Sequence, residues 1–232
     1  MNTHKKTARI VGALLIACTA ATIISILFSS PILSKPDYLV KLAQNEAQIL
    51  LGTFFEFIWA VTCAGIAIWL YPILKKYNGT LAFGSVGLRI VEGVFVLVGT
   101  LSLLSLLTLS QEFVSVGAPA DSSFQTSSTL LLAMRDWAHN VILLIAFNLG
   151  GLLYYYIFYQ SKLVPQWLSG WGIVGNVLSL AAIAYYAFTH DLGLIHTLLN
   201  APIALQEMVF AVWLIVKGFN PTAIASRSAK NR

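Results

Sequence analysis

The segment RDWAHN, residues 135–140, places an arginine, an aspartate, a histidine and an asparagine at the start of a long apolar run. Asp136 and His139 are three residues apart, a spacing that puts both on one helix face and suits an acid–base pair. Arg135 and His139 are four apart, as are Asp136 and Asn140. On a helix we therefore expect RDWAHN to present one wide polar face to other helices or to water.

Other ionisable residues also interrupt apolar runs. Arg89 and Glu92 are three apart, so they can pair on one face, whereas Glu56 and Glu207 have no such neighbour. A charged side chain at the centre of a membrane helix costs about 2.5–3.5 kcal/mol on insertion scales, so these groups should meet inside a bundle. The candidate ligand- or ion-binding residues are Glu56, Arg89, Glu92, Arg135, Asp136, His139, Asn140 and Glu207.

The charges of these candidates do not balance. Four acids accompany only two arginines within the apolar runs. We therefore predict that one acid is protonated, that His139 is charged, or that a cation binds. Glu207 is the acid that we expect to be protonated, because it has no basic neighbour on its own helix. We expect no metal, because a zinc site needs three or four ligands, mostly His or Cys. No cofactor is expected.

The composition identifies the surroundings of these residues. Of the 232 residues, 58% are hydrophobic and only 10% are charged, and the mean hydropathy is +0.79. A typical soluble domain is about 25% charged, so most of this chain must face lipid. Cys18 and Cys63 both lie in apolar runs and read as small core residues. The net charge of +5 is distributed as in a membrane protein and does not indicate nucleic-acid binding.

We predict an all-α polytopic fold, a bundle of six transmembrane helices that forms a single integral membrane domain over residues 1–232. The first run is interpreted as a span, because its apolar part is longer than the roughly 7–15 residues of a secretory signal. The predicted spans are about 8–30, 50–74, 81–109, 130–159, 168–188 and 198–217.

The loop charges predict the orientation. The N-terminus, the loops after the second and fourth spans, and the C-terminal tail at 218–232 with its flank carry ten Lys or Arg residues; the alternate loops carry two. Because cytoplasmic loops collect basic residues, both termini should be cytoplasmic. In the first outer loop, residues 34–50 predict a short amphipathic helix on the membrane surface. Residues 110–128 are Ser-rich and predict an exposed loop.

A weak internal repeat is also visible. Glu-x-Val-Phe occurs at Glu92 in the third span and at Glu207 in the sixth. Three spans separate the two copies, so the halves of the chain would have opposite orientations. Inverted repeats of this kind are typical of transporters.

Three segments resemble a known family: GLRIVEGVFVLVG, then RDWAHN with the following run through KLVPQWLSG, and ALQEMVFAVWLIVKGF. Together they are similar to the six-span membrane proteins called Domain of Unknown Function 4386. The residues that carry the resemblance are Arg89, Glu92, His139, Pro165, Gly170 and Glu207. It implies an integral protein of the bacterial or archaeal inner membrane, and it implies no activity.

Three classes of function remain open. The favoured one is binding or transport of a small molecule or ion through the polar residues, with a homodimer expected because six spans are few for a transporter. An intramembrane lipid-modifying enzyme would use Asp136 and His139 as acid and base; no nucleophile stands beside them. We therefore favour a protein that is not an enzyme. A non-catalytic subunit of a membrane complex would use the charges only to hold helices together.

Overall fold

The computed structural model describes residues 3–119 and 123–230, and every regular element in those ranges is helical. Six helices are long and apolar enough to cross a membrane, with α5, η1 and α6 forming one of them. The prediction of a six-span all-α protein is confirmed. The elements are α1 (Thr3–Leu33), α2 (Tyr38–Gln44), α3 (Glu46–Leu74), α4 (Gly79–Ser115), α5 (Ser123–Trp137), the π-helical η1 (Ala138–Ile142), α6 (Leu143–Ser161), α7 (Gln166–Thr189), α8 (Leu194–Val216) and α9 (Pro221–Lys230).

The Ser-rich segment 110–128 is mostly helical, so its prediction as a loop is wrong. Residues 110–115 end α4 and residues 123–128 begin α5; residues 120–122 lie outside the described ranges. Hydroxyls satisfy backbone carbonyls within these helix ends: Ser115 donates to the Glu112 carbonyl at 2.8 Å, and Ser128 to the Gln125 carbonyl at 2.9 Å. Serine therefore does not interrupt the helices here.

The predicted amphipathic helix at 34–50 is divided between two elements. Only α2 forms separately, and residues 46–50 already belong to α3. Leu39 and Leu42 of α2 are buried with apolar residues of α4, and the Tyr38 hydroxyl lies 2.8 Å from that of Ser128. The apolar face of this helix therefore packs on other helices; its place at the membrane surface stays a prediction.

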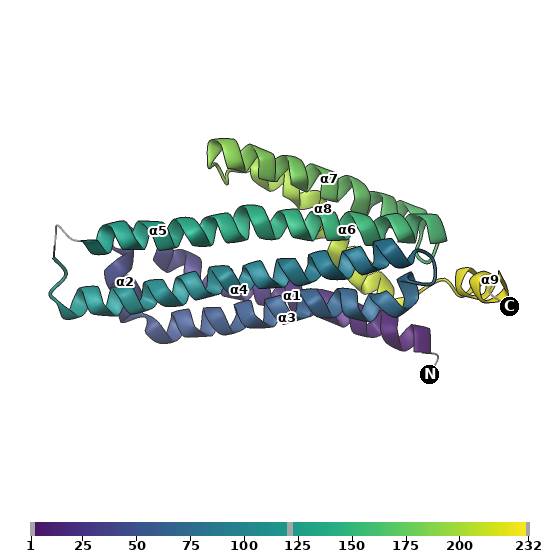
Figure 1. Ribbon diagram of the computed structural model, residues 1–232, viewed down its shortest axis with the longest axis horizontal. Coiled ribbons are helices and arrows are strands. Elements are labelled where there is room, and N and C mark those ends of the chain that lie inside the picture. Colours follow the sequence, from purple (N-terminus) through teal and green to yellow (C-terminus); the bar gives the residue numbers. More distant parts are fainter. Residues whose placement is uncertain (1–2, 120–122, 231–232) are drawn as a thin grey trace.

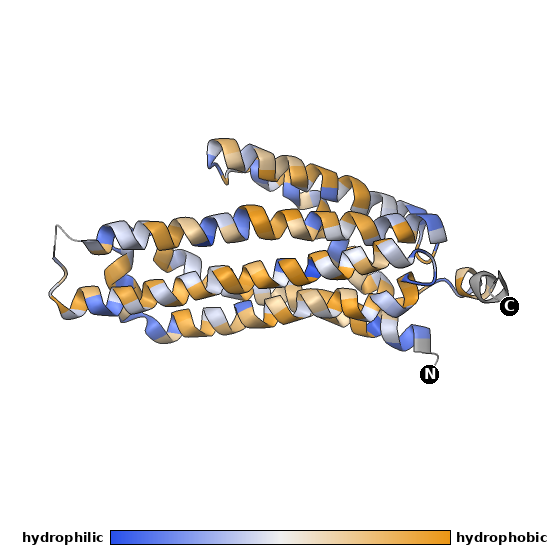
Figure 2. Ribbon diagram, in the orientation of Figure 1, coloured by the Kyte–Doolittle hydropathy of each residue, from blue (hydrophilic) through white to orange (hydrophobic). Residues whose placement is uncertain are grey.

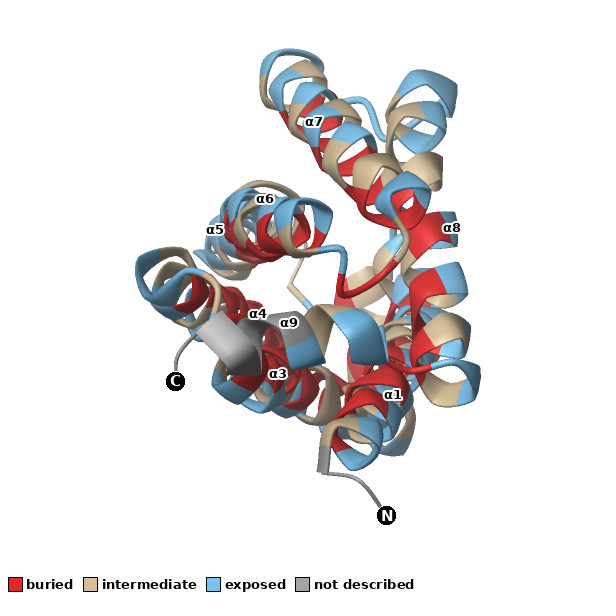
Figure 3. Ribbon diagram, turned by 90° about the vertical axis from the view of Figure 1, so that its right-hand side faces the viewer, coloured by how far each residue is buried: buried red, intermediate tan, exposed pale blue. Residues whose placement is uncertain are grey.

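The six spanning helices form a closed ring. Each contacts its neighbours along the chain, and α8 returns to contact α1 (Figure 3). This order does not fit an inverted repeat of three plus three helices. The repeat would place each of the first three spans on the span three positions later, which keeps the direction of the helix order around the ring. A two-fold axis in the membrane plane instead reverses that direction. The match between the segments at Glu92 and Glu207 is therefore local.

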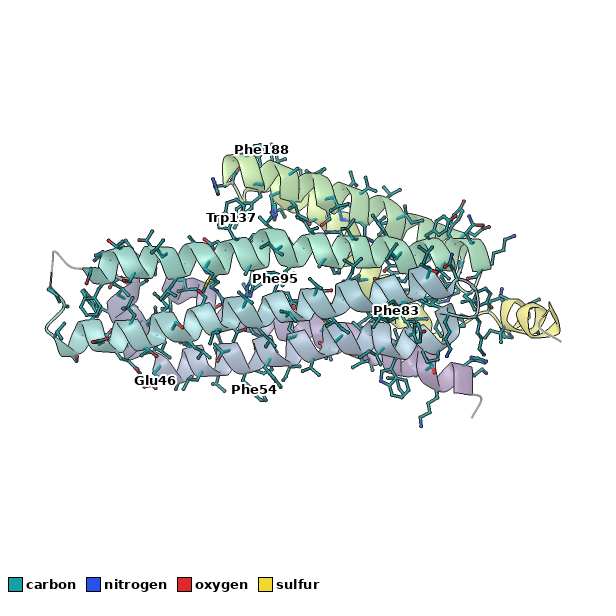
Figure 4. The ribbon with its side chains drawn as sticks, in the orientation of Figure 1. Glu46, Phe54, Phe83, Phe95, Trp137 and Phe188 are labelled. Atoms are coloured by element: carbon teal, nitrogen blue, oxygen red, sulfur yellow. The ribbon has the colours of Figure 1, made fainter. Side chains whose placement is uncertain are left out.

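Both termini lie at one end of the bundle, as an even number of spans requires (Figure 1). We call this the near end and the opposite one the far end. The α7–α8 hairpin stops well short of the far end, which α4 and α5 reach (Figure 1). Apolar residues cover the long helices (Figure 2). Phe54 and Phe188 point away from the bundle and are 58% and 90% exposed, as lipid contact requires (Figure 4).

Three apolar cores lie among the described residues: one at the near end, one at the far end, and a small one that joins Ala60 of α3, Val96 of α4 and Leu143 of α6. The near-end core includes the aromatic side chains of Tyr154, Tyr155, Phe158 and Phe210. The Phe210 ring centroid lies 5.6 Å from that of Tyr155 and 5.4 Å from that of Phe158, so α6 and α8 are tightly joined there. The far-end core joins α2 to the ends of α1, α3 and α4.

The segment after α8 is not only a basic tail. It contains α9, and the Tyr77 hydroxyl donates to the Ala223 carbonyl at 3.0 Å.

At the other end of α8, Asp191 organises the turn from α7. Its carboxylate accepts hydrogen bonds from the Tyr185 hydroxyl and the Gly193 N–H, which lower the pKa of Asp191.

Candidate functional site

A cavity of about 440 Å³ lies inside the ring and is lined by residues of all six spanning helices. This volume is in the range of small-molecule sites. Most of its wall is apolar and includes Trp59 of α3 and Phe147 of α6. The polar groups at one end of the wall are Arg89, Glu92 and Glu207, which we call the inner cluster.

The exposure of the lining residues shows where the cavity opens. Near the inner cluster, Arg89 is 1% and Leu15 is 2% exposed, whereas Ile23 and Ile26 of α1 are 52% and 53% exposed. His196, in the first turn of α8, also lines the cavity. The mouth therefore lies between α1 and α8 in the far half, and the aromatic core closes the near end.

The inner cluster combines one guanidinium with two carboxylates. Arg89 Nη1 donates to Glu92 Oε2 at 2.8 Å, as their spacing predicts. Arg89 Nη2 lies 3.9 Å from Glu207 Oε1 on α8, a longer ion pair without a hydrogen bond. Cys63 Sγ donates to Glu92 Oε1 at 2.9 Å and lies 3.6 Å from Cys18 Sγ. Glu92 is thus held on both oxygens, and Glu207 is not.

Two buried atoms of the inner cluster have no hydrogen-bond partner among the described residues. They are Arg89 Nε and Glu207 Oε1. Buried polar atoms are nearly always paired, so such atoms call for an explanation. Both residues line the cavity.

Glycines allow the helices to approach the inner cluster. A Cβ on Gly93 would lie 2.7 Å from the Ala60 carbonyl oxygen, so the α3 and α4 backbones meet one residue after Glu92. A Cβ on Gly150 would lie 3.4 Å from Arg89 Cγ. Small residues at helix crossings are the usual means of close packing in membranes.

Glu56 and Arg135 form a second group, the outer pair. Arg135 Nη2 donates to Glu56 Oε1, and Nη1 donates to Glu56 Oε2 at 3.2 Å and to the Gly99 carbonyl at 2.9 Å. The Thr100 hydroxyl adds a bond to Glu56 Oε2 at 2.6 Å. Among the described residues, no hydrogen bond or ion pair joins this pair to the inner cluster. The predicted residues therefore form two groups.

RDWAHN is divided between two neighbours. His139 sits with Arg135: its ring packs on Gly99, and Nε2 lies 3.2 Å from the Val96 carbonyl oxygen. Asp136 and Asn140 instead interact with Tyr186, near the end of α7. Asp136 is one position on from Arg135 and so faces about 100° away. The π-helical turn that begins at Ala138 then shifts the positions after it.

The predicted acid–base pair of Asp136 and His139 has no contact in the part of the chain that the structure describes. The two side chains face different neighbours, and neither lines the cavity.

Sequence reasoning missed several uncharged polar residues because, apart from Asn140, it considered only ionisable groups. Asn148 Nδ2 donates to Ser179 Oγ at 2.9 Å, and Ser179 Oγ donates to Asn200 Oδ1 at 2.6 Å, which links α6, α7 and α8. Ser179 and Asn200 line the cavity. Gln206 accepts from the Tyr155 hydroxyl at 2.6 Å and donates to the Leu168 carbonyl at 3.0 Å. Asn148, Asn200 and Gln206 could have been found in the sequence, because each is an amide side chain inside an apolar run.

The six apolar helices and the ring that they form define an integral membrane protein that crosses the bilayer several times. A family model described as Domain of unknown function (DUF4386) matches residues 10–218. The chain belongs to this family, and the resemblance seen in its sequence is confirmed. No curated protein and no solved structure matches the chain.

Proposed function

We propose that this protein binds a small lipophilic molecule in the cavity, as the binding step of transport across the cell membrane of a bacterium or archaeon. The observation that carries the proposal is an apolar cavity lined by all six spanning helices, with a charged group at its closed end. The loop charges put the mouth on the outer side of the membrane.

The contrast between the two charged groups supports binding over a purely structural role for the inner cluster. In the outer pair, both Glu56 oxygens accept hydrogen bonds from protein donors. The outer pair therefore has a sufficient structural role, which is to link α3 to α5. In the inner cluster, Arg89 Nε and Glu207 Oε1 have no hydrogen-bond partner among the described residues, and the contact of Oε1 with Arg89 Nη2 is long, at 3.9 Å. A group that served only to join helices would gain from pairing them.

Transport would also require the near end to open. Phe158 and Phe210 close it, and the hydrogen bonds of Gln206 fasten α8 to α6 and α7 there. Movement of the α7–α8 hairpin against the other helices would alternate access between the two ends. The homodimer expected from the small number of spans stays a prediction.

The test is a thermal-stability screen of the purified protein in nanodiscs against lipophilic compounds. The cavity variant is Ala204→Trp, since Ala204 lines the cavity and is exposed to it. The matched control is Ala13→Trp, at an exposed position of α1 that does not line the cavity. A ligand at 100 times its Kd adds about 2.7 kcal/mol of stability.

We expect at least one compound to stabilise the wild type and Ala13→Trp but not Ala204→Trp. Flux measurements with that compound in proteoliposomes then test transport. If every stabilising compound acts equally on all three proteins, the cavity is not a binding site and the proposal fails.

A further inference from the structure

We propose that the ligand of this cavity is an amphiphilic organic cation whose charged nitrogen pairs with Glu207. The inference rests on the proposed function and names the chemical class of its ligand. It also assigns different roles to the two carboxylates of the inner cluster: Glu92 holds Arg89, and Glu207 meets the ligand.

The geometry of the inner cluster separates these roles. Both Glu92 oxygens are occupied, one by Arg89 Nη1 at 2.8 Å and the other by Cys63 Sγ at 2.9 Å. The Glu92 side chain is 3% exposed, whereas that of Glu207 is 15% exposed. Glu207 therefore has the more accessible carboxyl group, and its Oε1, 3.9 Å from Arg89 Nη2, accepts no hydrogen bond from the described residues.

The charge around Glu207 favours a cation. Arg89 is the only Lys or Arg among the described residues that line the cavity, and Glu92 already uses its Nη1. The other titratable groups near Glu207 are Tyr154 and Tyr155 of α6 and Cys18 of α1. His196 of α8 lies eleven positions away, at the mouth. A bound cation would take the place of the proton that we expect on Glu207: with both carboxylates ionised, the site lacks one positive charge, which the cation supplies.

The walls favour an organic cation over a metal ion. A hard metal ion takes about six or more oxygen ligands, and the wall around Glu207 is mainly aliphatic and aromatic. Trp59 and Phe147 offer ring surfaces to a hydrocarbon body, although the Phe147 ring already holds Arg89, whose Cζ is 5.1 Å from its centroid. A ligand anion at Arg89 would instead lie against the two carboxylates, Glu92 and Glu207, that already flank the guanidinium.

The test uses three probes of similar size. Benzyltrimethylammonium is a cation, neopentylbenzene is its uncharged carbon isostere, and benzenesulfonate is an anion. Each is titrated calorimetrically into the protein in nanodiscs, with empty nanodiscs as the blank. The proteins are the wild type, Glu207→Gln and the control Glu112→Gln, the same change at an exposed residue near the end of α4.

We expect the wild type and Glu112→Gln to bind benzyltrimethylammonium at least tenfold more tightly than neopentylbenzene, and Glu207→Gln to lose this preference. The wild type could instead bind benzyltrimethylammonium and neopentylbenzene equally, with Ala204→Trp binding neither. This result would overturn the cation inference and leave the proposed function standing. Preference for benzenesulfonate would make Arg89 the recognition group and also overturn it. If no probe and no compound of the stability screen binds, both proposals fail. The wild-type comparison decides the matter even if Glu207→Gln does not fold.

Discussion

Arg89 and Arg135 differ in how fully their guanidinium groups are used. Arg135 donates from Nη1 and Nη2 to the Glu56 carboxylate and from Nη1 also to the Gly99 carbonyl. The Thr100 hydroxyl donates a further hydrogen bond to Glu56. Arg89 is fully buried, keeps Nε without a hydrogen bond and lies between two carboxylates. The hydrogen bonds of Arg135 therefore hold helices together, whereas the group around Arg89 still contains polar atoms that a ligand could satisfy.

The outer pair should therefore matter mainly for stability. Arg135→Met is expected to destabilise the fold by about 3–5 kcal/mol, because it leaves the buried Glu56 without its counter-charge. The double variant Glu56→Gln/Arg135→Met should recover part of this loss. Equilibrium unfolding in mixed micelles with increasing SDS measures both. An Arg135→Met protein as stable as the wild type would show that the pair contributes little.

How far the site could be predicted differs from residue to residue. The Arg89–Glu92 pair followed from its spacing, because residues three apart on a helix are neighbours. The partners of Glu207 and Glu56 did not, because they lie on other helices and one sequence does not contain the helix order. The division of RDWAHN depends on the π-helical turn at Ala138, for which the sequence has no recognised signal.

At the scale of elements, helix contacts depend on glycines that leave no room for a side chain. Gly93 lies on α4 where the Ala60 carbonyl of α3 approaches. Gly87, six residues earlier on the same helix, has no neighbouring atom of the described residues within 4 Å of its Cβ position. The two positions make a matched pair.

Gly93→Ala should destabilise the protein by about 1–3 kcal/mol, because α3 must move to make room. Gly87→Ala should be neutral or roughly 0.5–1 kcal/mol more stable, because alanine favours the helix. Thermal unfolding in one detergent compares the two variants. Equal effects at both positions would contradict the close contact of α3 and α4.

The helices themselves were predictable because apolar runs of about 20 residues have few alternatives in lipid. Their ends were not. The polar residues of 110–115 and 123–128 carry no apolar signal, yet their hydroxyls cap carbonyls within the helix. The split of 34–50 into α2 and α3 likewise depends on burial of Leu39 and Leu42 by distant helices.

At the scale of the whole molecule, the α7–α8 hairpin is made of the two shortest spanning helices. The α7 and α8 helices have 24 and 23 residues, close to the thickness of a bilayer, whereas α4 has 37. The far ends of α4 and α5, covered by α2, therefore extend beyond the hairpin (Figure 1). The mouth of the cavity lies beside this extension, between α1 and α8.

The most direct test of the account is whether the cavity opens to the outside. Thr22 lines it from α1, and Thr22→Cys puts a thiol there at the loss of one methyl group. In a Cys18→Ala/Cys63→Ala background, intact cells are treated with a membrane-impermeant thiosulfonate. Leu192→Cys in the α7–α8 turn and Gln166→Cys at the near end serve as the outer and inner references.

We expect Thr22→Cys to react together with Leu192→Cys in intact cells, while Gln166→Cys reacts only in inverted vesicles. An unreactive Thr22→Cys, or one that reacts only with Gln166→Cys, would contradict an outward-opening cavity and with it the proposed function.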